Sequence, residues 1–226
     1  MVESLNLGEV SLAHYGVLFF DELTEFNKNV LELLRVPLED KKITISRLNL
    51  AISYPCNFVF IASMNPCPCG YYGSGDRECC CRPEQIKKYI NKISGPLLDR
   101  IDLHIEVENV KYKKLESNKK IESSESIRKR VNNARNIQLK RYKEYSIFSN
   151  SELTPILIEK YCKLDDRSKL ILESAFDKLG LSARAYGRIL KVARTIADLE
   201  NSENIKVNHL AEAIQYRSLD RKYWKN

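Results

Sequence analysis

The sequence contains no hydrophobic run long enough to cross a lipid bilayer. Its longest strongly apolar runs, Tyr15–Phe20 and Phe58–Ala62, are only a few residues long, whereas a membrane-spanning helix needs about 20 apolar residues. The N-terminus lacks the basic and then apolar segments of a secretory signal peptide. We therefore expect a cytoplasmic protein, in which cysteines stay reduced and a cluster of them binds metal rather than forming disulfides.

The charge is unevenly distributed along the 226 residues. Residues 1–107 contain 11 Lys and Arg against 14 Asp and Glu, a net charge of −3, whereas residues 108–226 contain 26 against 16, a net charge of +10. The segment Lys111–Lys143 is the densest, with twelve basic and three acidic residues. A basic half favours a polyanionic partner such as nucleic acid, and a solvated helix face is the alternative explanation.

The hydrophobic pattern changes from strands to helices at about residue 107. Continuous apolar runs at 16–20 and 58–62 are typical of strands that are buried on both faces. Alternation predicts a hairpin over 42–52 and a third strand over 101–107. Helical periodicity predicts helices at 27–34, where Pro37 would end the helix, at 83–90 with Pro83 in the first turn, and then at 124–142, 154–162, 166–179, 182–199 and 207–216. We predict an α/β domain over 1–107, a linker over 108–123 and an all-helical domain over 124–226.

Polar residues follow the two apolar runs. Asp21 and Glu22 close the first run, and we expect Asn65 to end the second strand. Ligands of open α/β sheets bind at the carboxyl ends of the strands, where one acid can hold Mg²⁺ and another can accept a proton from water. An amide there can orient that water. The alternatives are a chance acidic pair and an Asn-Pro turn.

A basic residue precedes the third predicted strand. Arg100 lies in the stretch Ser94-Gly-Pro-Leu-Leu-Asp-Arg-Ile-Asp102, and a guanidinium can neutralise the charge that develops on a transferred phosphoryl group. A surface ion pair with Asp99 or Asp102 is the alternative.

Five of the seven cysteines lie between Cys67 and Cys81. Their arrangement is Cys67-Pro-Cys69, nine residues, and then Cys79-Cys80-Cys81. Four thiolates suit tetrahedral Zn²⁺, and a closed site of this kind is structural because it has no open position for catalysis. An iron–sulfur cluster and unmetallated thiols are the alternatives.

Six stretches together resemble one family. They are Gly8-Glu-Val-Ser-Leu-Ala-His14, Gly16-Val-Leu-Phe-Phe-Asp-Glu-Leu23, Asn65-Pro-Cys-Pro-Cys-Gly70, Ile93-Ser-Gly-Pro-Leu-Leu-Asp-Arg-Ile-Asp-Leu103, Leu181-Ser-Ala-Arg-Ala185 and Ala211-Glu-Ala-Ile-Gln-Tyr-Arg217. In this order they resemble the magnesium-chelatase-like AAA+ ATPases of bacteria, of the ComM/YifB competence-protein type. The resemblance implies an AAA+ P-loop core followed by a helical lid.

The resemblance also implies roles for individual residues. Asp21 and Glu22 are the Walker B pair, for Mg²⁺ and for general-base catalysis, and Asn65 is sensor 1. Arg100 is the arginine finger that reaches a neighbouring subunit. Arg184 is sensor 2, with Arg188 as a weaker candidate.

The resemblance implies two further features of the first domain. The zinc ligands are Cys67, Cys69, Cys79 and Cys81, within a zinc loop over residues 65–82. Because Cys80 lies between two of these ligands, we expect it to point away. The hairpin before sensor 1 contacts the substrate.

The phosphate-binding motif GxxxxGK[ST] does not occur in the sequence. We therefore interpret the chain as the distal part of a longer ATPase, with an incomplete AAA+ core, and expect it to hydrolyse ATP negligibly by itself. The resemblance implies that the whole protein uses ATP and Mg²⁺, forms a ring such as a hexamer, and remodels single-stranded or branched DNA by helicase or branch-migration activity. The alternatives are a magnesium chelatase ATPase subunit and a non-enzymatic module that binds zinc and nucleic acid.

Overall fold

The computed structural model describes residues 7–47, 50–75, 77–107 and 122–217. The chain divides into two compact units, one up to Ile101 and one from Asp102 onward, and each is described by itself. The first unit mixes strands and helices and the second is helical, as expected for an α/β core with a helical region after it. The predicted linker 108–123 lies almost entirely outside the described residues, so the domain limits stay a prediction.

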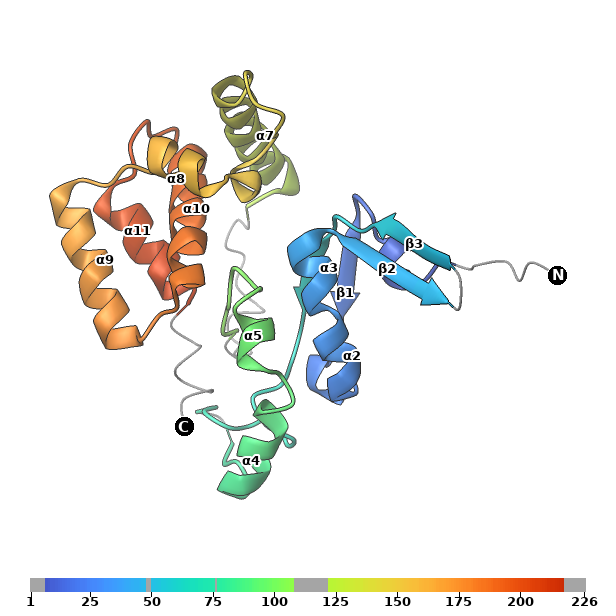
Figure 1. Cartoon of the computed structure of the whole chain (residues 1–226). Helices are drawn as coiled ribbons and strands as arrows, with labels where there is room; N and C mark the ends of the chain where they lie inside the picture. Colours follow the sequence, from blue (N-terminus) through green and yellow to red (C-terminus); the bar gives the residue numbers. More distant parts are fainter. Residues whose placement is uncertain (1–6, 48–49, 76, 108–121, 218–226) are drawn as a thin grey trace. The chain divides into compact units, whose positions relative to one another are not determined.

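The first unit contains two small sheets and several short helices (Figure 1). Its elements are α1 (Glu9–Leu12), β1 (Val17–Phe20), the 3-10 helix η1 (Leu23–Glu25), α2 (Lys28–Leu33), α3 (Arg35–Asp40), β2 (Lys42–Arg47), β3 (Leu50–Pro55), β4 (Val59–Ala62), α4 (Pro83–Ile90) and α5 (Gly95–Leu98). The antiparallel pair β2–β3 confirms the predicted hairpin. Pro83 is the first residue of α4, as predicted, where the missing N–H has no intrahelical partner.

Strands β1 and β4 pair in parallel, with Val17 opposite Val59 and Phe20 opposite Ala62. The prediction that both are buried on two faces is wrong for this structure. Val17, Phe19, Val59 and Ile61 share one face, since they alternate along the strands, and each is about half exposed. The described residues leave that face uncovered, and the opposite face contains the buried Leu18.

Two further local predictions are corrected. Residues 101–107 form no strand, because no strand among the described residues lies beside them to complete a hydrogen-bond ladder. Pro37 does not end a helix; α2 ends at Leu33, and Pro37 lies in the first turn of α3. A proline is tolerated there because the first N–H groups of a helix have no intrahelical acceptor.

The second unit consists of helices arranged around α10. Its elements are α7 (Ser124–Arg141), the 3-10 helix η2 (Asn150–Glu152), α8 (Pro155–Tyr161), α9 (Asp166–Leu179), α10 (Ala183–Leu199) and α11 (Val207–Gln215). Helix α10 contacts α7, α8, α11 and η2. Gly180 ends α9 with a φ of 50°, and Ser182 caps α10 by accepting a hydrogen bond from the Ala185 N–H.

The helical prediction is confirmed to within a residue or two at each end. No helix in the described ranges is long and apolar enough to cross a membrane.

A buried carboxylate on α10 joins three segments of the second unit. Asp198 is 1% exposed and accepts hydrogen bonds from Arg141 Nη1 and Nη2 at 2.8 and 2.5 Å, from Asn150 Nδ2 at 2.9 Å and from Arg194 Nε at 3.1 Å. Burial opposes the charge of Arg141, but the hydrogen bonds to Asp198 raise its pKa. Arg194 extends the network to the backbone carbonyls of Ser202 and Glu203.

Asp198→Ala is expected to destabilise the second unit strongly, because it leaves two buried guanidinium groups without a counter-charge. Removing one partner of a buried ion pair costs about 3–5 kcal/mol. Urea unfolding followed by circular dichroism measures the change in free energy. Asp177→Ala, at an exposed position on α9, is the control and should change stability little. A cost below about 1 kcal/mol for Asp198→Ala would contradict the proposed importance of this network.

Candidate nucleotide site and metal centre

Parallel pairing brings the ends of β1 and β4 together at one edge of the sheet. Asp21 and Glu22 follow β1 directly, and both are exposed. The hydrogen-bonded ladder continues one step beyond the strands, since the Ser63 N–H donates to the Phe20 carbonyl at 2.9 Å and the Leu23 N–H donates to the Ser63 carbonyl at 2.8 Å. The acidic pair is therefore held next to the segment that leaves β4.

Ser63 is a site residue that the sequence did not reveal. Its hydroxyl donates a hydrogen bond to Asp21 Oδ1 and accepts one from the Glu22 N–H at 3.2 Å. The Glu22 N–H also approaches Asp21 Oδ1 at 3.2 Å. One side chain thus orients the carboxylate of Asp21 and the backbone of Glu22.

Glu22 has a left-handed backbone conformation, with φ of 52° and ψ of 54°. Residues other than glycine seldom adopt it, because the Cβ atom crowds the backbone. The hydrogen bonds to Ser63 therefore hold a turn that is unfavourable in isolation. The turn leads at once into η1, whose Leu23 and Thr24 are buried.

Asn65 lies farther along than the sequence indicated. Strand β4 ends at Ala62, so Asn65 is three residues beyond the strand rather than at its end. Its side chain is exposed, and no hydrogen bond joins it to Asp21 or Glu22 in the described part of the chain. It nevertheless lies on the segment that Ser63 fixes against the acidic pair.

The three arginines singled out in the sequence have different surroundings. The side chain of Arg100 is 8% exposed; it pairs with Glu39 and donates to the Pro96 carbonyl at 2.7 Å. Arg188, on α10, pairs with Asp102 at 2.5 Å. Arg184 is exposed in the first turn of α10.

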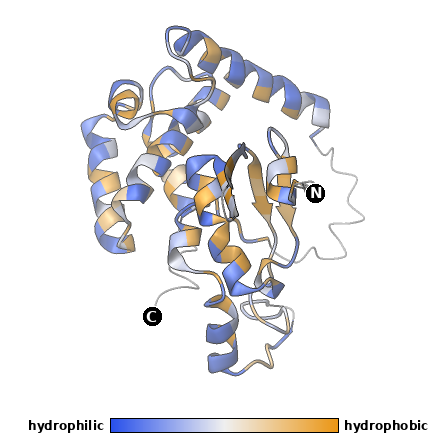
Figure 2. Ribbon diagram, turned by 45° about the vertical axis from the view of Figure 1, so that its right-hand side comes forward, coloured by the Kyte–Doolittle hydropathy of each residue, from blue (hydrophilic) through white to orange (hydrophobic). Residues whose placement is uncertain are grey.

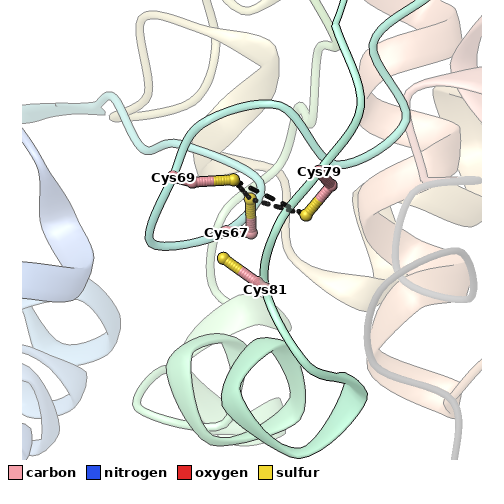
Figure 3. Close-up of side chains that lie close together, drawn as sticks. All are labelled: Cys67, Cys69, Cys79 and Cys81. Carbon is pink, nitrogen blue, oxygen red and sulfur yellow. Dashed lines mark hydrogen bonds between the residues drawn. The ribbon is translucent and has the colours of Figure 1, made fainter.

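Four cysteine side chains converge in the loop after β4 (Figure 3). The sulfur atoms of Cys67, Cys69, Cys79 and Cys81 all lie within 4.8 Å of one another, and three of the separations are 3.4, 3.6 and 3.7 Å. Tetrahedral zinc with Zn–S bonds of about 2.3 Å requires sulfur atoms about 3.8 Å apart. The donor set and its spacing therefore fit zinc.

The thiols of the cluster differ in the direction in which their pKa is shifted. Hydrogen bonds, first from the backbone of Tyr71, lower the pKa of Cys69 to about 5, whereas desolvation raises the pKa of Cys81 to about 12. The Tyr72 N–H also approaches Cys67 Sγ at 3.4 Å. Backbone donors thus stabilise thiolate charge at the cluster.

Loop geometry gathers the cysteines from two arms. Gly70 and Gly73 have φ of 82° and 77°, the left-handed region that glycine adopts without strain. Cys80 is exposed and lies outside the cluster. Cys67 is fully buried, so the cluster is anchored in the unit rather than in a free surface loop.

The helix after the cysteine loop is tied to the acidic turn. Lys92, just beyond α4, donates from Nζ to the Thr24 carbonyl at 2.7 Å. Burial raises the pKa of Tyr89, on the last turn of α4. The helix that follows the candidate metal centre is therefore linked to η1, which directly follows the turn formed by Asp21 and Glu22 (the acidic turn).

Comparison with known families decides the relationship. The profile "Magnesium chelatase, subunit ChlI" matches residues 2–115, and "Magnesium chelatase, subunit ChlI C-terminal" matches residues 121–217. The chain belongs to the magnesium chelatase family of AAA+ proteins. These two matches together cover the acidic turn, the cysteine loop and the helical unit.

Relatives were found in bacteria and archaea. The chain is 47% identical over 95% of its length to "Competence protein ComM" of Haemophilus influenzae and 43% identical over 95% to "Uncharacterized protein YifB" of Escherichia coli. It spans 41% of each of these two proteins. A more distant similarity, 26% identity over 89% of the chain and 26% of the relative, connects it to "Archaeal Lon protease" of Methanocaldococcus jannaschii.

Zinc-replete protein is expected to hold about one Zn²⁺ per chain, released when its thiols are modified, because four thiolates close one site. A 4-(2-pyridylazo)resorcinol assay measures the release. Cys79→Ser should lose the metal, since it removes one of the four sulfur donors. Cys80→Ser changes a neighbouring cysteine outside the cluster and is the matched control. Equal zinc contents in the two variants, or none in the unsubstituted chain, would refute the assignment.

Proposed function

We propose that this chain is part of an ATP-hydrolysing AAA+ motor that remodels DNA, by helicase or branch-migration activity, in a ring such as a hexamer. The observation that carries the proposal is the hydrogen bonding of the Ser63 hydroxyl to Asp21 and to the Glu22 N–H. It places two carboxylates beside the segment that leads to Asn65. Family membership supports a nucleotide as the ligand. The name of the H. influenzae relative supports a role in the uptake or recombination of DNA.

The roles of the acidic pair follow from this arrangement. Mg²⁺ bound with ATP neutralises phosphate charge, and Asp21 is the side chain proposed to hold it, most simply through water. Glu22 is proposed to accept a proton from the attacking water. Asn65 would orient that water or contact the γ-phosphate. All three groups are exposed in this chain, as groups that meet a ligand must be.

The arginines are proposed to act on the phosphates of the nucleotide. Arg184 is exposed and suits the sensor 2 role on α10. Arg100 is proposed as the arginine finger of a neighbouring subunit, for which its guanidinium must exchange Glu39 for phosphate oxygens. Ring assembly would then couple nucleotide binding to the ion pair between α3 and the segment after α5.

Zinc is proposed to have a structural role, in which it fixes the loop that follows Asn65. Asn65 is two residues before the buried Cys67, and Lys92, just beyond α4, donates to the Thr24 carbonyl in η1. A closed thiolate site would therefore restrict the segment that positions Asn65. Its chemistry is structural, since all four positions are sulfur.

A second candidate is an ATPase subunit of magnesium chelatase, which the descriptions of the two family profiles favour. The cysteine cluster and the 47% identity to the competence protein favour the DNA motor. Stimulation of ATP hydrolysis by DNA, rather than by a porphyrin with partner subunits, distinguishes the two.

Glu22→Gln is expected to lower ATP hydrolysis about 10²-fold or more while nucleotide binding persists, because it removes the proposed base and keeps the shape of the side chain. The assay uses a chimera in which this chain replaces the matching region of the H. influenzae relative, so that a complete motor is measured. Glu25→Gln, exposed in η1, is the control. Full activity in Glu22→Gln would disprove the assignment. Comparable turnover by the 226-residue chain alone would contradict the separate expectation that the chain hydrolyses ATP negligibly by itself.

Ser63→Ala in the same chimera is expected to raise the Mg²⁺ concentration for half-maximal ATPase activity about tenfold, because hydrogen bonds to charged groups contribute roughly 1.5–3 kcal/mol. Ser63→Thr keeps the hydroxyl and should restore the original Mg²⁺ dependence. A purely structural loss would lower activity at every Mg²⁺ concentration. An unchanged Mg²⁺ dependence in Ser63→Ala therefore counts against a positioning role for this serine.

A further inference from the structure

Helix α7 has one buried side and one long exposed side. Within it only Ala134 and Gln138 are buried, and residues 124–133 are all exposed. Ile127 and Val131 continue the row that is buried farther along at Ala134 and Gln138, which defines the inward side of the helix. Figure 2 shows that this helix is mainly hydrophilic with a few hydrophobic bands.

The outward side of α7 contains cations and amides at helical spacing. Positions i, i+4, i+7 and i+11 place four exposed residues in one row: Lys129, Asn133, Asn136 and Lys140. The adjacent row adds Arg128 and Asn132. We call these six residues the α7 outward face.

Positive charge on this face exceeds negative charge. Glu125, the one acidic residue of α7, lies four positions before Lys129 on the same side of the helix and offsets one of its three cations. Glu122, just before the helix, pairs with Arg130, which is not part of the outward face. Among the described residues, the structure gives no ion pair to Arg128, Lys129 or Lys140. The face therefore attracts a polyanion.

The spacing of these groups matches double-stranded DNA. Lys129 and Lys140 are eleven positions apart, which corresponds to about 16 Å along the helix axis, and their long side chains can reach phosphates on the two sides of a major groove about 12 Å wide. The three asparagines lie between these cations. Asparagine can donate to and accept from one base edge, adenine above all.

We propose that the α7 outward face is a contact surface for double-stranded DNA, with Arg128, Lys129 and Lys140 on phosphates and Asn132, Asn133 and Asn136 in the groove. The inference rests on the proposed action on DNA, but it assigns the contact to an element separate from the nucleotide site. The asparagines favour DNA over an acidic protein surface, for which cations alone would suffice.

Fluorescence anisotropy of the 226-residue chain with a labelled duplex tests the cations. Lys129→Ala combined with Lys140→Ala should weaken binding about tenfold or more and make the slope of log K against log salt about 2 units shallower between about 50 and 200 mM salt. Arg167→Ala combined with Lys178→Ala removes the same charge from exposed positions on α9 and should change both quantities much less.

A second pair of substitutions tests the amides. Asn133→Ala combined with Asn136→Ala should weaken binding of the duplex several-fold with an unchanged salt slope, because it removes no charge. If either α7 pair behaves like the α9 control, or a single strand of the same sequence binds more tightly than the duplex, the inference is overturned. Absence of any duplex binding also overturns it, whereas the proposed ATPase is judged separately in the chimera.

Discussion

Hydrogen bonding between the parallel strands β1 and β4 is the constraint on which the candidate site depends. Both strands consist of apolar residues, and the candidate site residues follow them. Because the register places Phe20 opposite Ala62, the residues after the two strands lie side by side. Ser63 uses this proximity. It extends the ladder through its backbone and holds Asp21 and the strained Glu22 turn through its hydroxyl. An arrangement of this kind preorganises charged groups before a ligand arrives, which is what electrostatic catalysis of phosphoryl transfer requires.

The cysteine cluster concerns the longer segment between β4 and α4, which also needs contacts that fix its position. A loop of this length between β4 and α4 has little apolar surface of its own, so hydrophobic burial cannot order it. Two glycines with positive φ and the buried Cys67 shape this loop, and four sulfur atoms spaced for zinc would let the proposed metal order it. The hydrogen bond from Lys92, just beyond α4, to the Thr24 carbonyl then joins the segment after the loop and its helix to η1.

The helical unit depends on a buried ion-pair network as well as on its apolar core. Its apolar core surrounds α10, and the buried Asp198 neutralises two arginines that would otherwise repel each other. Since Arg141 is the last residue of α7, this ion-pair network also anchors the helix that carries the α7 outward face. Anchoring at one end leaves the first ten residues of α7 exposed.

Local patterns in the sequence determined most of the secondary structure. Pro83, Gly180 and Ser182 act on their own backbone, so the limits of α4, α9 and α10 could be predicted from neighbouring residues alone. The acidic pair and the paired cysteines were also visible, since their spacing is short. The tertiary structure decided what lies across the sheet and between distant segments. Ser63 is 42 residues from Asp21, and Glu39 is 61 residues from Arg100. The exposure of one face of β1 and β4 was likewise decided by the tertiary structure. The physical reason is that a side chain's hydrogen bonds and burial depend on which segments pack against it, and one-dimensional periodicity records only the direction in which that side chain points.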